Sequence, residues 1–406
     1  MPETDNGRTR PGVDIHSPAN QANPYPTYAY LRQHHPVCQL EPDGMWAVSR
    51  YDDARFVLTH PELFSSSGFK ALLHQDWIRE DCRRDLPMVM DDPPEHTKYR
   101  GLVSKAFAHR VLNALAPLMD ETARGLIRQI RRGQEVDFLD RFAFPYVGTI
   151  IGHVAGTADS QSLDELHHWV KLVEKNTPMR PDDAYIQALE AAILKQNAYF
   201  DAVIADRRTR PRQDLVTELL NAEVDGHRLT PVMLRNVLDL LIGSGFHTTL
   251  HALGNCVVRL AQGPDILASL VRQPGLIPAF IEEVLRLEPP VHYVFRQATG
   301  AVTVSDTTIP AGAFVVVLLA AANRDPARFA NADDFDMARP DGKRHLAFGY
   351  GPHLCLGAAL ARLEIKIALQ VILAAFKQVS CPAREDLDWT YPSMVRGLTS
   401  LPVTFH

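Results

Sequence analysis

The stretch Phe348-Gly349-Tyr350-Gly351-Pro352-His353-Leu354-Cys355-Leu356-Gly357 combines glycine turns, one cysteine and a predicted helix start near Leu356. Glycine adopts backbone conformations that other residues avoid, and a helix N-terminus favours negative charge. Both features favour a thiolate and suit Cys355 as a metal ligand. A lone cysteine is otherwise most often a buried thiol in a tight turn. The full glycine, histidine and cysteine pattern favours the metal ligand.

This stretch resembles the haem-binding loop of the cytochromes P450, in which one cysteine thiolate is the proximal ligand of haem iron. The resemblance implies haem b as the cofactor and Cys355 as the iron ligand. It also implies that Phe348 packs beside the ligand, that His353 binds a haem propionate, and that Gly357 belongs to the same cofactor-binding loop.

The composition indicates a protein with a large core and no affinity for nucleic acid. The chain has 406 residues, 46% of them hydrophobic, and a net charge of -6. Its N-terminus is polar and lacks the apolar stretch of a signal peptide, and no long apolar run predicts a membrane anchor. The five cysteines show neither zinc spacing nor a disulfide framework, so we expect a cytoplasmic protein.

The apolar pattern predicts a mainly α fold with small β-sheets. Helical periodicity covers most of the chain, and short strands are predicted at 45–48, 302–304 and 314–319. Residues 1–20 are polar and proline-containing, so we expect a loosely ordered segment, followed by a single catalytic domain over 21–406. The resemblance implies the cytochrome P450 fold, with haem between a long distal helix and the helix that follows the cysteine loop.

The longest predicted helix covers residues 231–261, with Thr230 as its N-cap and Pro231 as its first residue. Its middle, Ile242-Gly243-Ser244-Gly245-Phe246-His247-Thr248-Thr249, contains two glycines, which lower helix stability. One explanation is a packing contact that needs small residues, with Thr248 bonded to the Ser244 carbonyl. In the resemblance this segment is the distal helix, where O2 binds beside Ser244, Gly245 and Thr248.

His247 departs from the pattern of the family, which usually has an acidic residue before the threonine. Histidine transfers protons near neutral pH. We therefore hypothesise that His247 takes the place of the acid in proton delivery. The alternative is a hydrogen-bonded core histidine, with protons arriving through water or the substrate.

Glu283 and Arg286 lie three residues apart and therefore on one helix face. Taken alone, this spacing is typical of a solvated surface pair. Together with Arg339 in the segment 335–340, it resembles the buried Glu-Arg-Arg cluster of the P450 family. The resemblance implies a structural role for all three residues.

His96 and Arg100 share a helix face and suit the binding of one carboxylate. Spacing alone also fits a helix start with exposed charges. By resemblance these two residues bind one haem propionate, and Arg296 with His345 or His353 binds the other.

The resemblance implies a haem-thiolate monooxygenase that inserts one atom of O2 into a small to medium hydrophobic organic molecule, such as a natural-product intermediate. No flavin or iron–sulfur motif is present, so a separate ferredoxin or flavodoxin with its reductase would supply electrons. The alternatives are a peroxide-driven or atypical haem-thiolate catalyst, and a haem-binding sensor without turnover. Mainly apolar residues are the expected substrate contacts: Phe246, Tyr293, Val294, Phe295 and Thr399.

Overall fold

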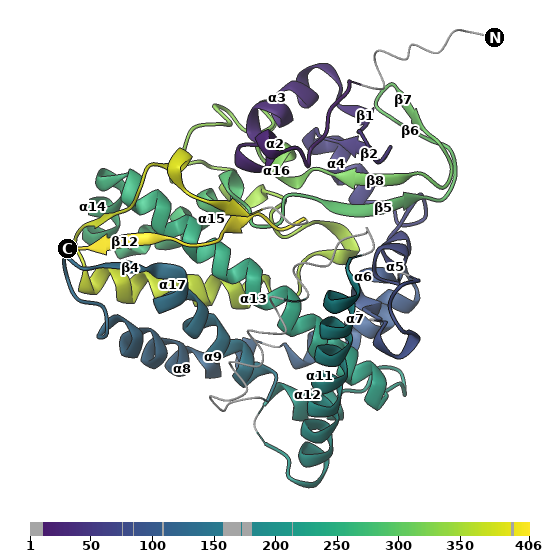
Figure 1. Ribbon diagram of the computed structural model, residues 1–406, viewed down its shortest axis with the longest axis horizontal. Coiled ribbons are helices and arrows are strands. Elements are labelled where there is room, and N and C mark those ends of the chain that lie inside the picture. Colours follow the sequence, from purple (N-terminus) through teal and green to yellow (C-terminus); the bar gives the residue numbers. More distant parts are fainter. Residues whose placement is uncertain are drawn as a thin grey trace. The chain divides into compact units, whose positions relative to one another are not determined.

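The computed structural model describes residues 11–74, 76–83, 85–107, 109–156, 172, 181–212, 214–390 and 394–406. These residues are mainly helical with small sheets, which confirms the predicted fold class (Figure 1). The chain divides into two compact units, each built from separate segments. The first unit comprises Met1–Phe69, Pro278–Cys355 and Ala383–Thr399, and the second comprises Lys70–Ile277, Leu356–Pro382 and Ser400–His406.

The first unit is organised around a five-stranded sheet with the order β1-β2-β8-β5-β3, in which only the β2–β8 pair is parallel. The unit also contains two small sheets of two antiparallel strands each. The bounds are β1 (Val37–Gln39), β2 (Trp46–Val48), β3 (Phe64–Ser65), β5 (Val294–Ala298), β8 (Phe314–Val317), β6 (Val302–Val304) with β7 (Thr307–Ile309), and β10 (Trp389–Thr390) with β11 (Gly397–Leu398). The strands predicted from the apolar pattern are thus confirmed as β2, β6 and β8.

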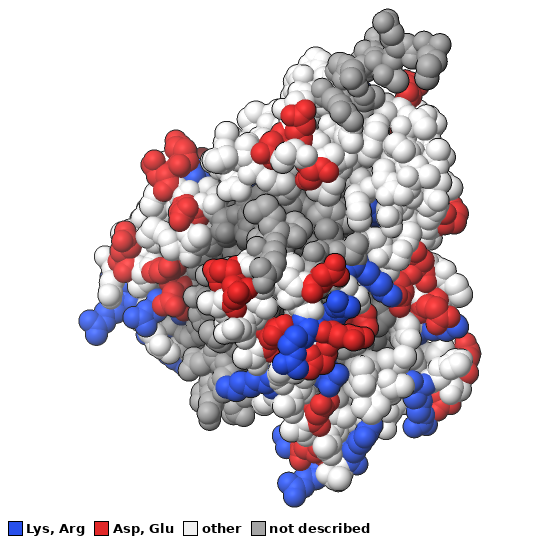
Figure 2. Space-filling view, turned by 45° about the vertical axis from the view of Figure 1, so that its right-hand side comes forward, with Lys and Arg blue, Asp and Glu red and all other residues white. Residues whose placement is uncertain are grey.

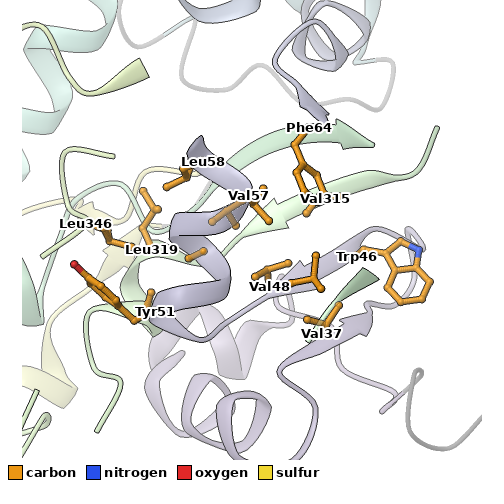
Figure 3. Packing of buried hydrophobic residues seen from close by; sticks show 14 of the residues in the cluster. Val37, Trp46, Val48, Tyr51, Val57, Leu58, Phe64, Val315, Leu319 and Leu346 are labelled. Carbon is orange, nitrogen blue, oxygen red and sulfur yellow. The ribbon is translucent and has the colours of Figure 1, made fainter. Parts of the chain in front are cut away.

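Both faces of this sheet are buried. On one face, Val48 and Val315 pack against Val57 of helix α4 (Tyr51–Thr59), and Figure 3 shows these side chains meeting between helix and strands. On the opposite face, Val316 packs with Leu31 of helix α3 (Tyr25–His34). Because side chains alternate along a strand, neighbouring residues of one strand enter different parts of the core.

The N-terminal segment is packed from its first described residues onward. Ile15 is buried, and the Ser17 hydroxyl accepts a hydrogen bond from the N–H of Asn20, which caps helix α2 (Pro18–Ala22). Residues 1–10 of the segment that was expected to be loosely ordered lie outside the described residues, so that expectation stays a prediction. The remaining helices of this unit are α15 (Ile277–Leu287, its first residue in the second unit) and α16 (Leu319–Ala322), with the 3₁₀ turns η4 (Gly342–Arg344), η5 (Gly351–His353) and η6 (Arg384–Asp386).

The second unit is a helical assembly with a three-stranded sheet of order β4-β12-β9. Helix α8 packs against α17, and α13 packs against α9 and α17. The bounds are α6 (Pro87–Met90), α7 (Glu95–Ala106), α8 (His109–Ile127), α9 (Phe144–Val154), α11 (Asp183–Thr209), α12 (Leu215–Asn221), α13 (Pro231–Gln262), α14 (Pro264–Arg272), α17 (Ala358–Ala375), β4 (Glu135–Asp137), β9 (Val379–Ser380), β12 (Pro402–Phe405), the single-turn helices η1 (Glu80–Cys82), η2 (Leu139–Ala143) and η3 (Pro274–Leu276), and α5 (Gly68–Leu73), which begins in the first unit.

Helix α13 confirms the predicted long helix and its start. The Thr230 hydroxyl accepts a hydrogen bond of 3.2 Å from the N–H of Met233, and Pro231 is the first helical residue. Most of its residues are buried by neighbouring helices. Although α13 is long, none of the described helices is both long and apolar enough to cross a bilayer.

The described surface carries charges of both signs. Figure 2 shows one face of the molecule. Where lysine and arginine side chains gather on this face, aspartate and glutamate side chains lie beside them. Such mixing fits the small net charge of -6 and differs from the basic stripe that nucleic-acid binding requires.

Candidate functional site

The cysteine loop presents the thiol of Cys355 on an ordered turn. The N–H of Cys355 donates a 2.8 Å hydrogen bond to the carbonyl of Phe348. Gly349 and Gly351 both have a φ of 72°, and a Cβ at Gly351 would lie 2.5 Å from the carbonyl oxygen of Leu58. Glycine is therefore required at position 351 by both conformation and space. Cys355 is exposed and is not part of a disulfide.

His353 and Arg296 are the basic side chains of this unit that were predicted to bind a propionate. His353 lies on η5, and its Nε2 is 3.0 Å from the hydroxyl of Ser66. Arg296 lies on β5, is 7% exposed, and donates to the carbonyl of Phe295 at 2.7 Å. Both side chains are thus held in place by local contacts.

His345, the alternative to His353, is occupied by other contacts. It is buried, its Nδ1 accepts a 3.2 Å hydrogen bond from the N–H of Ala347, and its Nε2 lies 3.2 Å from the carboxylate of Glu282. Both ring nitrogens therefore face protein groups. The assignment of His345 or His353 to a propionate stays a prediction.

In the second unit, His96 and Arg100 lie one turn apart on α7. The His96 side chain is buried together with its two polar ring nitrogens. An exposed thiol in a glycine loop, together with arginine and histidine side chains that can hold carboxylates, is the set of donors that haem b requires. The residues of this chain therefore fit the group.

The middle of α13 shows why its small residues are present. The Thr248 hydroxyl donates a 2.6 Å hydrogen bond to the carbonyl of Ser244, as one of the two sequence explanations predicted. A Cβ at Gly245 would lie 2.8 Å from Cδ1 of Ile151 on α9. Close approach of the two helices therefore accounts for Gly245, and Ser244 itself is exposed.

His247 has a second histidine one turn further along α13. The ring centres of His247 and His251 are 6.1 Å apart. Burial, and secondarily the neighbouring His247, lowers the pKa of His251 to about 3, so His251 stays neutral at physiological pH. Sequence reasoning missed His251, although its spacing of four residues from His247 places both on one helix face.

The structure brings Glu283, Arg286 and Arg339 together inside the first unit. Arg286 donates to both carboxylate oxygens of Glu283 at 2.8 Å, and Arg339 donates to one of them at 3.1 Å. Arg286 also donates to the carbonyls of Asn323 and Ala332. The cluster ties α15 to the loop before the cysteine segment.

The expected substrate contacts do not share one surface. On β5, Val294 and Arg296 pair with Val317 and Val315 and so lie on the face that packs against α4. Phe295 points to the opposite face, where its ring centre lies 5.4 Å from that of the buried Tyr293. Val294 is therefore the only one of these three that lies on the Arg296 face.

The two remaining expected contacts are held by protein groups. Phe246 is buried in the second unit, with its ring centre 4.9 Å from that of Phe144. The Thr399 hydroxyl, in the first unit, donates a 2.7 Å hydrogen bond to the carboxylate of Asp388. Thr399 is exposed and so is the more accessible of the two.

A mainly helical fold with an exposed cysteine in a glycine loop and a buried Glu-Arg-Arg cluster defines a haem-thiolate protein. The family model described as Cytochrome P450 matches residues 17–273 and 275–404. The chain belongs to the cytochrome P450 family.

Relatives and solved structures agree over nearly the whole chain. Cytochrome P450 107B1 of Saccharopolyspora erythraea is 38% identical over 93% of both chains, and the vitamin D(3) 25-hydroxylase of Pseudonocardia autotrophica is 34% identical over 96% of both. The structure of a cytochrome P450 from Chondromyces apiculatus has a TM-score of 0.89 and 35% identity, and covers 97% of this chain and 98% of its own. The protein is thus a P450-type oxidoreductase of the monooxygenase class, with haem b as its cofactor.

Proposed function

We propose that this protein inserts one oxygen atom from O2 into a small to medium hydrophobic organic substrate, with electrons from a separate ferredoxin or flavodoxin and its reductase. The observation that carries this proposal is the exposed Cys355 thiol on its glycine loop. When bound, haem supplies the oxygen-activating chemistry, and the thiolate would ligate its iron.

The surrounding residues would hold the cofactor. Its carboxylates would be neutralised by basic side chains, namely Arg296, His353, His96 and Arg100. Phe348 would pack beside the thiolate, and Gly357 would end the loop. Local hydrogen bonds already restrain Arg296 and His353, so less conformational entropy would be lost on binding.

The substrate would be mainly apolar. Val294 lies on the Arg296 face and Thr399 is exposed, so these two are the best candidates for direct contact. Phe246, Tyr293 and Phe295 pack against other aromatic rings, so we expect them to contribute indirectly. The name of the Pseudonocardia relative specifies vitamin D(3), which is an apolar molecule. This supports a hydrophobic substrate for the present chain.

His247 would deliver protons on the distal side, with the Thr248 hydroxyl as the next donor. The variants His247→Phe and His247→Asp provide the test. Phenylalanine cannot transfer a proton, whereas aspartate restores an acid at this position. We expect His247→Phe to lower the ratio of product formed to reductant consumed, and His247→Asp to preserve it. An unchanged ratio in both variants would refute the relay.

The substrate class can be found by titrating the ferric protein optically with apolar, aromatic and steroid compounds. A shift toward the high-spin spectrum with one class of compound would identify that class as the substrate class.

The assignment of Cys355 is tested by the variant Cys355→Ser. It should lose the thiolate-type spectrum of the reduced carbon monoxide complex, and retention of that spectrum would overturn the assignment.

A second candidate is a peroxide-driven catalyst of the same family, which the histidine at position 247 favours because it replaces the usual acid. Turnover with hydrogen peroxide, but none with ferredoxin and its reductase, would support it. The opposite pattern would support the O2-dependent reaction.

A further inference from the structure

Glu288 forms a buried ionic cluster outside the residues discussed so far. It follows α15 and is 6% exposed. Arg384 donates to its two carboxylate oxygens at 2.6 and 2.9 Å, Arg324 donates at 3.1 Å, and the hydroxyl of Tyr25 donates at 2.7 Å. Arg396 Nη1 lies 3.9 Å from the same carboxylate. We refer to Tyr25, Glu288, Arg324, Arg384 and Arg396 as the Glu288 cluster.

Arg396 is the most deeply buried of the three arginines in the cluster, and it is held through both its side chain and its backbone. It is 2% exposed, its guanidinium lies 3.9 Å from the ring centre of Trp389, and it donates to the carbonyl of Ala22 at 2.8 Å. Its backbone N–H donates to the carbonyl of Pro290 at 2.7 Å. Stacking on Trp389 and simultaneous contacts with Ala22 and Glu288 suit the planar guanidinium of arginine better than the ammonium of lysine.

The backbone around Arg396 runs antiparallel to the residues that lead into β5. The N–H of His292 donates to the carbonyl of Met394 at 2.8 Å, and Val291 forms a β-bridge with Val395. Two residues after His292, β5 begins at Val294, and three residues after Arg396 the chain reaches Thr399. Arg396 therefore connects the two segments that carry the best candidates for substrate contact.

We propose that the Glu288 cluster, acting through Arg396, sets the spacing between the Val294 and Thr399 segments and thereby determines which sizes of ligand the site accepts. Arg396 is a positioning residue in this scheme, because it acts through the backbone of the two segments. The proposal rests on the proposed function, since it takes Val294 and Thr399 as substrate contacts.

Arg324 provides a matched comparison within the same cluster. It also donates to Glu288, and its guanidinium stacks on an aromatic ring, 3.7 Å from the centre of Tyr25. However, its additional ion pair is with Asp333 at 3.0 Å, and it lies outside the 394–399 segment. Loss of either arginine should weaken the cluster, but only loss of Arg396 should affect strand β11, which precedes Thr399.

The test compares Arg396→Lys with Arg324→Lys in the haem-loaded protein. Two probes are titrated optically against the ferric form: imidazole, which is small, and 4-phenylimidazole, which extends further into the pocket. In Arg396→Lys we expect the ratio of the two dissociation constants to change roughly tenfold, because a displaced segment would affect the larger probe more than the smaller one. In Arg324→Lys the ratio should stay within about twofold.

Thermal unfolding of both variants separates positioning from general destabilisation. If Arg396→Lys does not retain haem, Trp389→Leu serves instead, because it removes the stacking partner and leaves the arginine. An unchanged probe ratio in a variant of Arg396 or Trp389 that retains haem, or equal changes in the variants of Arg324 and Arg396, would overturn the inference. Failure of the unsubstituted protein to show thiolate-ligated haem would instead overturn the proposed function.

Discussion

Arg286 donates one hydrogen bond to each carboxylate oxygen of Glu283, and both are 2.8 Å long. Both side chains are buried, and the Glu283 carboxylate accepts further bonds from Arg339 at 3.1 Å and from the N–H of Asp336 at 2.9 Å. A desolvated ion pair of this kind is strongly destabilised when only one partner is removed, because the other charge remains buried.

Arg286→Ala should therefore lower the free energy of unfolding by about 3–5 kcal/mol, because the Glu283 carboxylate would stay buried without its main partner. Urea unfolding followed by circular dichroism measures this. Arg344→Ala is the control, since the pair of Arg344 with Asp341 is exposed and should contribute at most about 1 kcal/mol. Equal losses in the two variants would contradict a special role for the buried pair.

Gly245→Ala should be mildly destabilising although alanine is the better helix former. The new methyl group would lie 2.8 Å from Cδ1 of Ile151, and such overpacking costs about 1–3 kcal/mol, against a gain of about 1 kcal/mol in helix propensity. Ile151→Val removes that Cδ1 atom. In the Ile151→Val background, Gly245→Ala should become neutral or stabilising, and a double-mutant cycle by urea unfolding measures the coupling.

The absence of coupling in this cycle would show that the α9 and α13 helices separate to accept the methyl group. In that case close packing would not be the reason for glycine at position 245.

Glu364→Gln should stabilise the protein increasingly as the pH rises. Glu364 is buried on α17, and burial raises the pKa of its carboxyl from 4.5 to about 8. Between these values the unfolded chain loses a proton that the folded state keeps, so the wild-type protein loses stability as the pH increases. The gain from the substitution should grow from pH 5 to pH 8 and then level off in urea unfolding series. A gain independent of pH would contradict this sign.

Glu288→Gln should show the opposite pH dependence. Despite its burial, its three arginine partners lower the pKa of Glu288 from 4.5 to about 2. A lowered pKa stabilises the folded state above about pH 4.5, and this contribution is lost as the pH falls toward 2. The variant should therefore be less stable than wild type at pH 7, and the difference should shrink in acid. A difference that persists unchanged at pH 2.5 would contradict the assignment.

Much of the cofactor site follows from the sequence because its signals are local. The glycine loop ending at Cys355 is contiguous, the Thr230-Pro231 start of α13 depends on neighbouring residues, and the i, i+3 spacing of Glu283 and Arg286 places them on one face of α15. Helix caps, tight turns and helical spacing are set within a few residues.

Other features were decided by the tertiary structure alone. Val294 and Phe295 are neighbours in sequence, but the two-sided sheet sends them into different cores. The Glu288 cluster joins residues up to 371 positions apart, from Tyr25 to Arg396. Such contacts depend on which distant segments fold together, and the identity of a single arginine or glutamate carries no information about its partner.

The sequence by itself determined the cysteine loop, the long capped helix and the family resemblance. Only tertiary packing decided which side chains are buried and which are paired, because burial and pairing arise between segments far apart in the chain.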